Sequence, residues 1–545
     1  MSHWTVVPVL LPGMLAAIIV LAARHQPSLA RILSVAGTIG LLALTIALFW
    51  RASDGSIDVY LLGDWAAPFG IVLVTDRLST LMTLLTAALA LPVLLYAIGS
   101  GWDLRGKHFH ALFQFQVMGI MGAFLTGDVF NLFVFFEILL IASYGLMIHA
   151  GGGPRLRAGT QYVLYNLLGS TLFLFALGTL YAETGTLNMA DLAQRVAAID
   201  AGSSAGIRVA AVLLLLVFAV KAAVLPLHFW LPASYSEAPA PVAALFAIMT
   251  KVGAYCIIRI YTLIFPPDLA VTQGLFDTWL LPAALLSLAV GMIGVLGAGR
   301  IDRLVAFAAI GSMGMLMTAL AIFTPQGIAA ALYYAMHSTL ATAVLFLLVD
   351  AVQVGRGRAG TDLQAGSPVS GGPLTAGMFF LAAIAMCGLP PLSGFIGKLL
   401  VLDAARGSDL AVISWAVILL TSLVAIVGFA RAGSQVFWKS HQIAAKQADA
   451  FETEADEANI SDGAPNPGPL MAVSIGMLLA MIVALTIFAG PVTTTVERTA
   501  AQLFDGEDYI ATILGTEGKV IEYHGDDYGD ADAATGGADQ EEAAE

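Results

Sequence analysis

The chain has 545 residues, of which 59% are hydrophobic and only 11% are charged. Soluble globular domains carry about 25% charged residues, so this composition excludes an ordinary soluble domain and indicates a membrane protein. The formal net charge is −14, and many of the acidic residues lie after Phe504, so part of this excess belongs to the end of the chain. A chain with this acidic balance has no basic surface for nucleic acid, and no nucleic-acid partner is expected.

Apolar runs of about 20 residues recur along the chain, each long enough to cross a lipid bilayer as an α-helix. They lack the alternating pattern of a β-barrel strand. We therefore predict an all-α polytopic membrane protein with about 14 transmembrane helices. The predicted spans are 4–23, 31–50, 72–97, 109–127, 129–149, 158–182, 208–232, 240–262, 277–299, 303–323, 327–351, 374–404, 410–437 and 468–490.

These spans group into regions that include two sets of five helices. Each set is predicted to be one copy of an inverted repeat, because each contains one long span interrupted by prolines, and an odd number of helices turns the second copy upside down. The predicted regions are N-terminal transmembrane helices (1–108), a first five-helix repeat (109–262), a second five-helix repeat (277–437), a cytoplasmic polar loop (438–467), a C-terminal transmembrane helix (468–490) and an acidic disordered tail (505–545).

Basic residues mark alternate connections between the predicted spans. These are Arg24 and Arg31, Arg105 and Lys107, Arg155 and Arg157, Arg300 and Arg303, and Arg356 and Arg358. By the positive-inside rule these connections are cytoplasmic. An even number of spans then places both termini on the extracytoplasmic side, and no cleavable signal peptide is apparent at the first span. We expect a multi-pass protein of the bacterial cell (inner) membrane.

The stretch from residue 217 to 251 places charges and prolines in an apolar background. A lysine at the centre of a membrane span costs about 2.5–3.5 kcal/mol on insertion scales. Prolines break the helix, which is tolerated only where protein or water satisfies the freed backbone groups. Lys221 precedes Pro226 and Pro232 here, and a second interruption at Pro390 and Pro391 precedes Lys398. Paired broken helices indicate a transport site.

Five ionisable residues form the predicted proton path. Glu137 lies inside an apolar span and needs a cation, for which Lys221 is the natural partner. Lys251 shares one helix face with Tyr255 and Arg259.

Histidine exchanges protons near physiological pH, so His337 is interpreted as a relay between lysines. Lys398 is the candidate exit from this path. Arg259 is interpreted as a snorkelling anchor near the outer end of its span, and Asp350 and Asp403 as interfacial residues. Each of these charges has a plainer interpretation as a contact that only joins helices.

No cofactor is predicted. The sequence has no Walker-type phosphate loop, no dinucleotide fingerprint and no Cys or His cluster for a metal or haem. The two cysteines, Cys256 and Cys387, are far apart in sequence and lie in apolar spans, which fits neither a disulfide framework nor a metal site. The pattern indicates proton movement through side chains and water, and no metal site is expected.

The segment LPLHFWLPASYSEAPAPVAAL between Lys221 and Lys251 resembles the proton-conducting membrane subunits shared by respiratory complex I and the Mrp-type multisubunit cation/proton antiporters. The resemblance covers about residues 60 to 440. It implies that Glu137 and Lys221 form a pair and that Lys251, His337 and Lys398 continue a hydrated axis across the membrane. The segment FFEILLIASYGLMIHAGGG is most similar to the D-type subunits of the antiporters.

The resemblance implies a secondary transporter subunit and not an enzyme. Its expected activity is proton translocation in a multisubunit Na⁺ (or other monovalent cation)/H⁺ antiporter that drives cation efflux and serves pH homeostasis. Its expected partners are the A, B, C, E, F and G types of Mrp subunit. One alternative is a proton-pumping subunit of a redox complex, either complex I or a membrane-bound hydrogenase, and another is an assembly scaffold whose charges only join helices.

Overall fold

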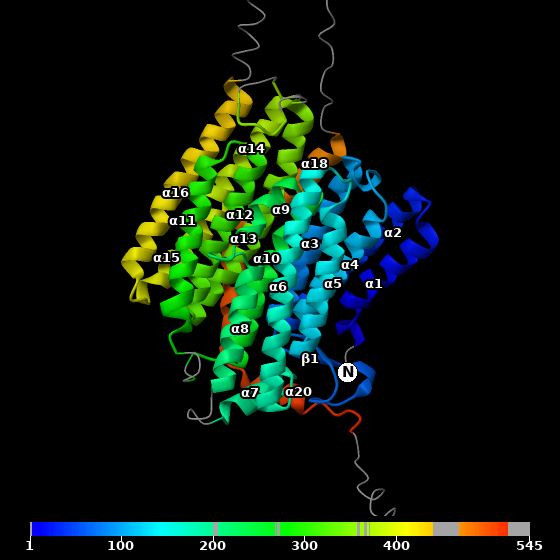
Figure 1. The fold of residues 1–545 in the computed structure, drawn as a ribbon, viewed down its shortest axis with the longest axis vertical. Helices are drawn as coiled ribbons and strands as arrows, with labels where there is room; N and C mark the ends of the chain where they lie inside the picture. Colours follow the sequence, from blue (N-terminus) through cyan, green and yellow to red (C-terminus); the bar gives the residue numbers. More distant parts are fainter. Residues whose placement is uncertain are drawn as a thin grey trace, which may run out of the picture.

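The computed structural model describes residues 3–199, 205–267, 269, 273–356, 360–364, 368–369, 371–439 and 468–520. These residues form an elongated bundle whose helices run mostly along its long axis (Figure 1). Ten of the helices are long and apolar enough to cross a membrane. The prediction of a helical polytopic membrane protein is confirmed, except that a two-stranded β-sheet is present as well.

The helices are joined mostly by short connections. Those before residue 270 are α1 (Val7–Ile18), α2 (Pro27–Ala52), α3 (Arg77–Gly99), α4 (Phe109–Leu125), α5 (Val129–Met147), α6 (Gly153–Thr184), α7 (Met189–Ala197), α8 (Ala205–Lys221), α9 (Trp230–Glu237) and α10 (Ala240–Leu263). Those after it are α11 (Leu281–Gly297), α12 (Ile301–Ala321), α13 (Pro325–Arg356), α14 (Gly372–Cys387), α15 (Ser393–Ala404), α16 (Ala411–Gly433), α18 (Pro469–Ile487), α19 (Ala489–Phe504) and α20 (Glu507–Leu514).

Helices α10, α12 and α13 form the centre of the bundle. The apolar windows of α10 and α13 are completely buried and that of α12 is 94% buried, whereas only 28% of the window of α2 and 33% of that of α16 are buried. A helix that is apolar on all sides belongs in a core, and here two such helices also carry Lys251 and His337. The most buried helices are therefore also the ones that hold ionisable groups.

The predicted break after Lys221 is present. Helix α8 ends at Lys221, and α9 begins only at Trp230. The backbone groups freed by this break find partners inside the protein, as a membrane interior requires. The Trp230 indole donates to the Val220 carbonyl (3.0 Å), and the Leu225 amide donates to the Ser287 hydroxyl (2.8 Å).

The second predicted break is present as well. Helix α14 ends at Cys387 and α15 begins at Ser393, so Pro390 and Pro391 lie in the connection between two half-helices. The predicted span 374–404 is therefore two helices in series. Both breaks interrupt helices at points where prolines remove backbone donors.

One end of the bundle carries the β-sheet and both ends of the described chain (Figure 1). Strand β1 (Asp58–Leu61) pairs antiparallel with β2 (Val72–Thr75), and β2 leads into α3. The C-terminal segment reaches this hairpin, because the Lys519 amide donates to the Asp64 carbonyl (2.6 Å) and the Ala66 amide donates to the Lys519 carbonyl (3.0 Å).

The segment predicted to be an acidic tail begins with structured residues. Glu507–Leu514 form α20, and its residue Tyr509 is buried. Residues 521–545 of the predicted tail, and residues 440–467 of the predicted cytoplasmic loop, lie outside the described residues. The C-terminal candidate span is Pro469–Ile487, close to the predicted 468–490, and α19 follows it after a single residue.

The Trp230 indole hydrogen bond is testable. Replacing Trp230 by Phe removes one of two donors to the Val220 carbonyl, which also accepts from the Ala223 amide (3.1 Å), so we expect the free energy of unfolding to fall by about 0.5–1.5 kcal/mol. Thermal unfolding of the purified protein in detergent measures this loss. The matched control is Trp50→Phe, because the Trp50 side chain is 80% exposed. Equal stability of the two variants would contradict the assigned role.

Candidate functional site

Two of the predicted lysines lie at the carboxyl ends of half-helices. Lys221 is the last residue of α8 and is 4% exposed. The Lys398 ammonium lies beside the last residue of α14, donating to the Cys387 carbonyl (2.5 Å) and to the Ser422 hydroxyl (2.7 Å). The carboxyl end of a helix carries a partial negative charge, which stabilises a cation placed there. The two breaks therefore create the sites that hold the two lysines.

Glu137 and Lys221 interact electrostatically, as predicted. They form no direct ion pair: within the described chain, one carboxylate oxygen of Glu137 and the Lys221 ammonium are both buried without a hydrogen-bond partner. The ammonium lies 5.9 Å from the centre of the Phe136 ring. Neither group is held by a fixed contact here, so either can change partner with a small movement.

His337 connects the two halves of the predicted path. It is completely buried and lies within electrostatic range of both Lys251 and Lys398. Its Nδ1 atom is 2.9 Å from the hydroxyl of Ser393, the first residue of α15, while its Nε2 atom has no partner within the described residues. The ring is thus anchored on one nitrogen, and the other nitrogen is available to exchange a proton.

Gly394 allows α15 to lie close to His337 and to the end of α14. A Cβ atom added to Gly394 in α15 would lie 2.0 Å from the Ala385 carbonyl oxygen and 2.8 Å from His337 Nε2. Any side chain at this position would therefore displace either the start of α15 or the histidine ring. The break between α14 and α15 sets the position of His337 as well as that of Lys398.

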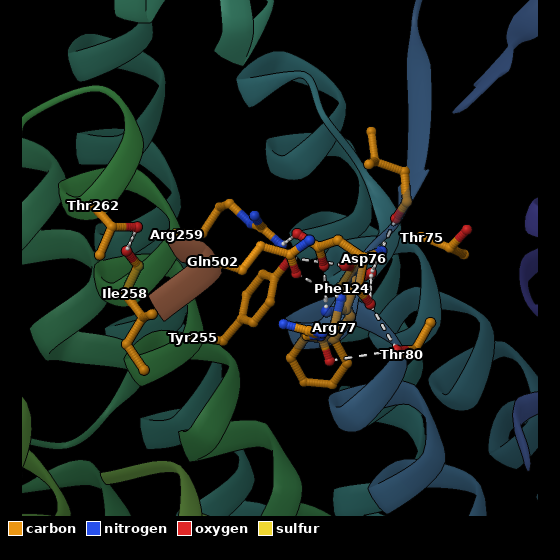
Figure 2. Close-up of polar contacts among 12 residues, drawn as sticks. Thr75, Asp76, Arg77, Thr80, Phe124, Tyr255, Ile258, Arg259, Thr262 and Gln502 are labelled. Atoms are coloured by element: carbon orange, nitrogen blue, oxygen red, sulfur yellow. Dashed lines mark hydrogen bonds and ion pairs between the residues drawn. The ribbon is translucent and has the colours of Figure 1, made fainter. Parts of the chain in front are cut away.

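The prediction that Arg259 is a snorkelling anchor is wrong. Its side chain is buried and forms an ion pair with Asp76, with 2.6 Å between Nη2 and Oδ2 (Figure 2). Asp76 also caps α3 by accepting from the Ser79 amide (2.8 Å). Tyr255 lies one turn before Arg259 and donates to the Phe124 carbonyl (2.7 Å). The polar face of α10 therefore leads from Lys251 to a buried ion pair.

The C-terminal helices cover this ion pair. The Arg259 guanidinium lies 5.1 Å from the centre of the Tyr509 ring in α20. In α19, the Gln502 side chain accepts from the Arg77 amide (3.3 Å), next to Asp76 (Figure 2). Burial raises the pKa of the Tyr509 hydroxyl, so it stays neutral. The Asp76–Arg259 pair is enclosed and is not open to solvent.

A cavity of about 1190 Å³ lies at the opposite end of the bundle. Its walls include the basic connections, with Arg105, Arg155 and Arg300. Arg300 forms ion pairs with Asp302 and with Glu237 at the end of α9 (3.2 Å to Glu237). Three of the basic loops predicted to share one side of the membrane therefore meet at one cavity.

Asp350 also lines this cavity, near the end of α13, and it is buried there. Its side chain is 4% exposed and accepts hydrogen bonds from the Tyr96 hydroxyl (2.9 Å) and the Trp102 indole (3.1 Å). Asp403 is exposed and pairs with Arg406 (3.3 Å), as an interfacial residue does. Among the described residues, no group of three His, Cys, Asp or Glu side chains is placed to hold a metal ion.

Comparisons with known proteins identify the family. A family model described as the transmembrane domain of NADH:quinone oxidoreductase/Mrp antiporter proteins matches residues 126–425. The chain is 36% identical over 537 residues to the D-type subunit of a probable K⁺/H⁺ antiporter of Rhizobium meliloti (strain 1021), covering 92% of this chain and 96% of that one. The chain belongs to this family.

Other relatives extend the match along the chain. It is 36% identical to the D-type subunit of the Na⁺/H⁺ antiporter of Bacillus subtilis (strain 168), covering 94% of this chain and all of that one. A chain in the structure of the Mrp complex from Dietzia sp. DQ12-45-1b is 27% identical, with a TM-score of 0.83. The match covers 94% of this chain and all of that one. The recognition of the antiporter family from the sequence is confirmed.

The range matched by the family model includes the predicted proton path but not the whole of the Asp76–Arg259 region. All five predicted path residues lie inside the matched range 126–425, whereas Asp76 and Tyr509 lie outside it. The sequence carried one signal for Asp76, since an aspartate three residues before a serine at the start of an apolar run is typical of a helix N-cap. That signal predicts a cap and says nothing about an ion pair with Arg259.

A double-mutant cycle tests the buried ion pair. Asp76→Asn keeps the oxygen that caps α3 but removes the charge, and Arg259→Met removes the partner. Each single change leaves an unpaired buried charge, so we expect each to cost about 3–5 kcal/mol of unfolding free energy. The double variant should lose clearly less than the sum, as measured by thermal or denaturant unfolding.

The matched control is the exposed pair of Arg51 and Asp58, which are 2.8 Å apart. The same cycle there should give a coupling of about 1 kcal/mol or less, since solvent screens exposed pairs. If the losses of unfolding free energy from the Asp76 and Arg259 variants are additive, the two charges do not stabilise each other and the assigned ion pair is contradicted.

Proposed function

We propose that this chain is the proton-translocating subunit of a multisubunit antiporter that exchanges Na⁺ or another monovalent cation for protons. The observation that carries the proposal is a set of ionisable groups inside the bundle: Lys221, Lys251, His337 and Lys398 are buried, and Glu137 is partly buried. The proposed path runs from Glu137 to Lys398. Such groups are expensive in a membrane and are retained where ions move. The relatives named as D-type components of antiporters support the same activity.

Helix α10 gives this line access to both ends of the bundle. Ala243 lines the cavity beside the basic loops, and Lys251 lies eight residues further along the helix. Arg259 lies eight residues beyond Lys251, so each interval is about 12 Å at 1.5 Å per residue. Lys251 is thus midway between the cavity and the Asp76–Arg259 pair. We propose that protons enter through the cavity and that the Asp76–Arg259 pair separates Lys251 from the extracytoplasmic side.

Mutual repulsion among the cations supplies a mechanism for passing protons along the line. His337 lies in the electrostatic field of both Lys251 and Lys398, so a proton on either lysine disfavours a proton on the histidine. Glu137 favours the charged form of Lys221. Movement of Glu137 away from Lys221 therefore weakens the hold of Lys221 on its proton and passes charge toward Lys251.

The position of Glu137 supports coupling to another subunit. It is only partly buried and lies on the outer face of α5 between Phe130 and Ile141, whose side chains are 46% and 65% exposed. A carboxylate facing lipid is costly, so this face is suited to cover by a protein partner. We propose that this partner is one of the A, B, C, E, F and G types of Mrp subunit, and that its charges move Glu137.

The finer predictions of topology belong to the same proposal. The ten candidate spans, together with Val7–Ala23, Phe109–Leu125 and the two broken pairs α8–α9 and α14–α15, add up to 14 crossings. The five-helix repeats at 109–262 and 277–437 would each contain one broken pair, in inverted orientation. The basic cavity then faces the cytoplasm of a bacterial cell, and both termini lie on the extracytoplasmic side of the inner membrane.

The chain acts in this proposal as a secondary transporter without catalytic chemistry or a cofactor. The alternative is a proton-pumping subunit of a redox complex, which would use the same line of charges with a different energy source. Relatives that are 36% identical are named as antiporter subunits, which favours the antiporter. The proteins that co-purify with this chain distinguish the two functions: small membrane subunits support the antiporter, and quinone or iron–sulfur subunits contradict it.

Charge removal tests the proton path directly. Glu137→Gln and Lys221→Met each remove one charge of the proposed gate, so we expect Na⁺-dependent proton movement to be abolished. The measurement is the change of a pH-sensitive dye in energised membrane vesicles when Na⁺ or K⁺ is added. Matched controls are Glu183→Gln and Lys439→Met, since both side chains are exposed. Normal antiport in the Glu137 or Lys221 variant would refute the path, provided the complex assembles.

The Gly394 contact gives an independent test that removes no charge. Gly394→Ala forces His337 or α15 to shift, because the new methyl group overlaps the Ala385 carbonyl. Displacements of about 1 Å at a reacting group cost about 100-fold in rate, and we expect antiport to slow by about that factor. Gly377→Ala in α14 is the control, since no atom outside its own helix backbone and chain neighbours lies within 4 Å of the new methyl group. Equal transport rates in both variants would contradict the role of His337.

A further inference from the structure

A second cavity, of about 510 Å³, lies between the α1–α2 connection and the start of α4. It shares the end of the bundle with the first cavity, because Trp102 lines the first cavity and Asp103 lines this one. None of the five proposed proton-path residues lines it. Its basic lining residues come from two separate connections: Arg24, His25, Lys107, His108 and His110.

The acidic residue in this cavity is already neutralised. Arg31 donates two hydrogen bonds to Asp103, from Nε to Oδ2 (2.6 Å) and from Nη2 to Oδ1 (2.9 Å). Burial alone would raise the pKa of Asp103, but the hydrogen bonds from His110 and Arg31 hold it below the usual value, so it stays ionised. With this charge matched by Arg31, the remaining basic groups leave the cavity with a net positive potential.

His110 contributes a buried ring nitrogen that has no partner in the described part of the chain. The residue is 6% exposed and its Nε2 atom is 3.2 Å from Asp103 Oδ2. Its Nδ1 atom is buried and has no hydrogen-bond partner in the described part of the chain. A buried polar atom without a partner costs free energy unless a ligand supplies one. A histidine that donates to a carboxylate through one nitrogen carries an N–H on the other nitrogen only in its protonated form, and in that form it can donate to an anionic oxygen.

Apolar residues complete the cavity. Its inner wall includes Ile19, Ala23 and Ala30. Leu104 also lines the cavity, and its side chain is 57% exposed. A free inorganic anion gains nothing from apolar walls, whereas a phospholipid has a charged headgroup attached to apolar chains. Basic pockets between membrane helices on the cytoplasmic side are suited to anionic lipid headgroups.

We infer that this cavity binds the phosphodiester headgroup of an anionic phospholipid, with Arg24, Lys107 and His110 as its ligands. The acyl chains extend from the cavity along the exposed apolar side chain of Leu104. The site binds a regulatory or structural lipid at the face of the bundle formed by α1, α2 and α4. This inference needs only the membrane location of the chain and does not depend on the proposed proton path.

Native mass spectrometry of the purified protein, with the subunits that co-purify with it, tests the lipid site. The probes are cardiolipin, phosphatidylglycerol and zwitterionic phosphatidylethanolamine, each titrated in detergent. We expect both anionic lipids to bind more tightly than phosphatidylethanolamine. Each basic residue near an anionic headgroup contributes about fivefold in affinity, so the double variant Arg24→Gln/Lys107→Gln should bind about 25-fold more weakly.

Three further measurements make the outcome decisive. His110→Gln should also weaken binding, whereas Arg51→Gln, at the other end of the bundle, should leave it unchanged. Inorganic phosphate, titrated as a competitor, should fail to displace cardiolipin. Displacement by phosphate with no preference among the three lipids would identify a free-anion site and overturn the lipid assignment. The lipid assignment is also overturned if the double variant and Arg51→Gln bind lipid with equal affinity. Loss of lipid binding when the co-purifying subunits are present overturns it as well.

Discussion

Backbone groups and charges inside a membrane are costly without partners, and each of the two broken helices of this chain places a lysine beside the carboxyl end of a half-helix. A break frees carbonyl groups at the end of a half-helix, and a buried lysine needs negative potential. At the second break one contact meets both needs, because the Lys398 ammonium donates to the Cys387 carbonyl. At the first break the Trp230 indole satisfies the Val220 carbonyl, and Lys221 itself ends the helix.

The second break also positions a side chain on one of the central helices. Helices α10 and α13 are buried on all sides, yet they carry Lys251 and His337 between the two breaks. Ser393, at the start of the half-helix after the second break, holds one nitrogen of His337. The geometry of the breaks therefore fixes the position of groups on helices that are themselves unbroken. Changes in the connection between half-helices are transmitted to the centre of the bundle through these side chains.

Much of the fold and of the proposed path was predictable because its signals are local. A proline or a lysine in an apolar span is anomalous in its own sequence neighbourhood, so Lys221, Lys398 and both breaks could be located without any tertiary information. The partners of Arg259 and Asp350 could not. Asp76 precedes Arg259 by 183 positions in the chain, and Tyr96 precedes Asp350 by more than 250, so only the packed bundle brings them together. Position near a span end predicted a snorkelling side chain for Arg259, and burial by distant segments overturned that prediction.

The cover over the Asp76–Arg259 pair has a consequence for biosynthesis. Domains of a growing chain fold from the N-terminal side first, and helices α3 and α10 are complete long before Tyr509 is made. During that interval the outer end of α10 lacks the residues that enclose it. The last described segment of the chain to be synthesised is therefore the one that seals it. A nascent chain that stalls before α19 therefore lacks both Gln502 and Tyr509, the residues that cover the Asp76–Arg259 pair.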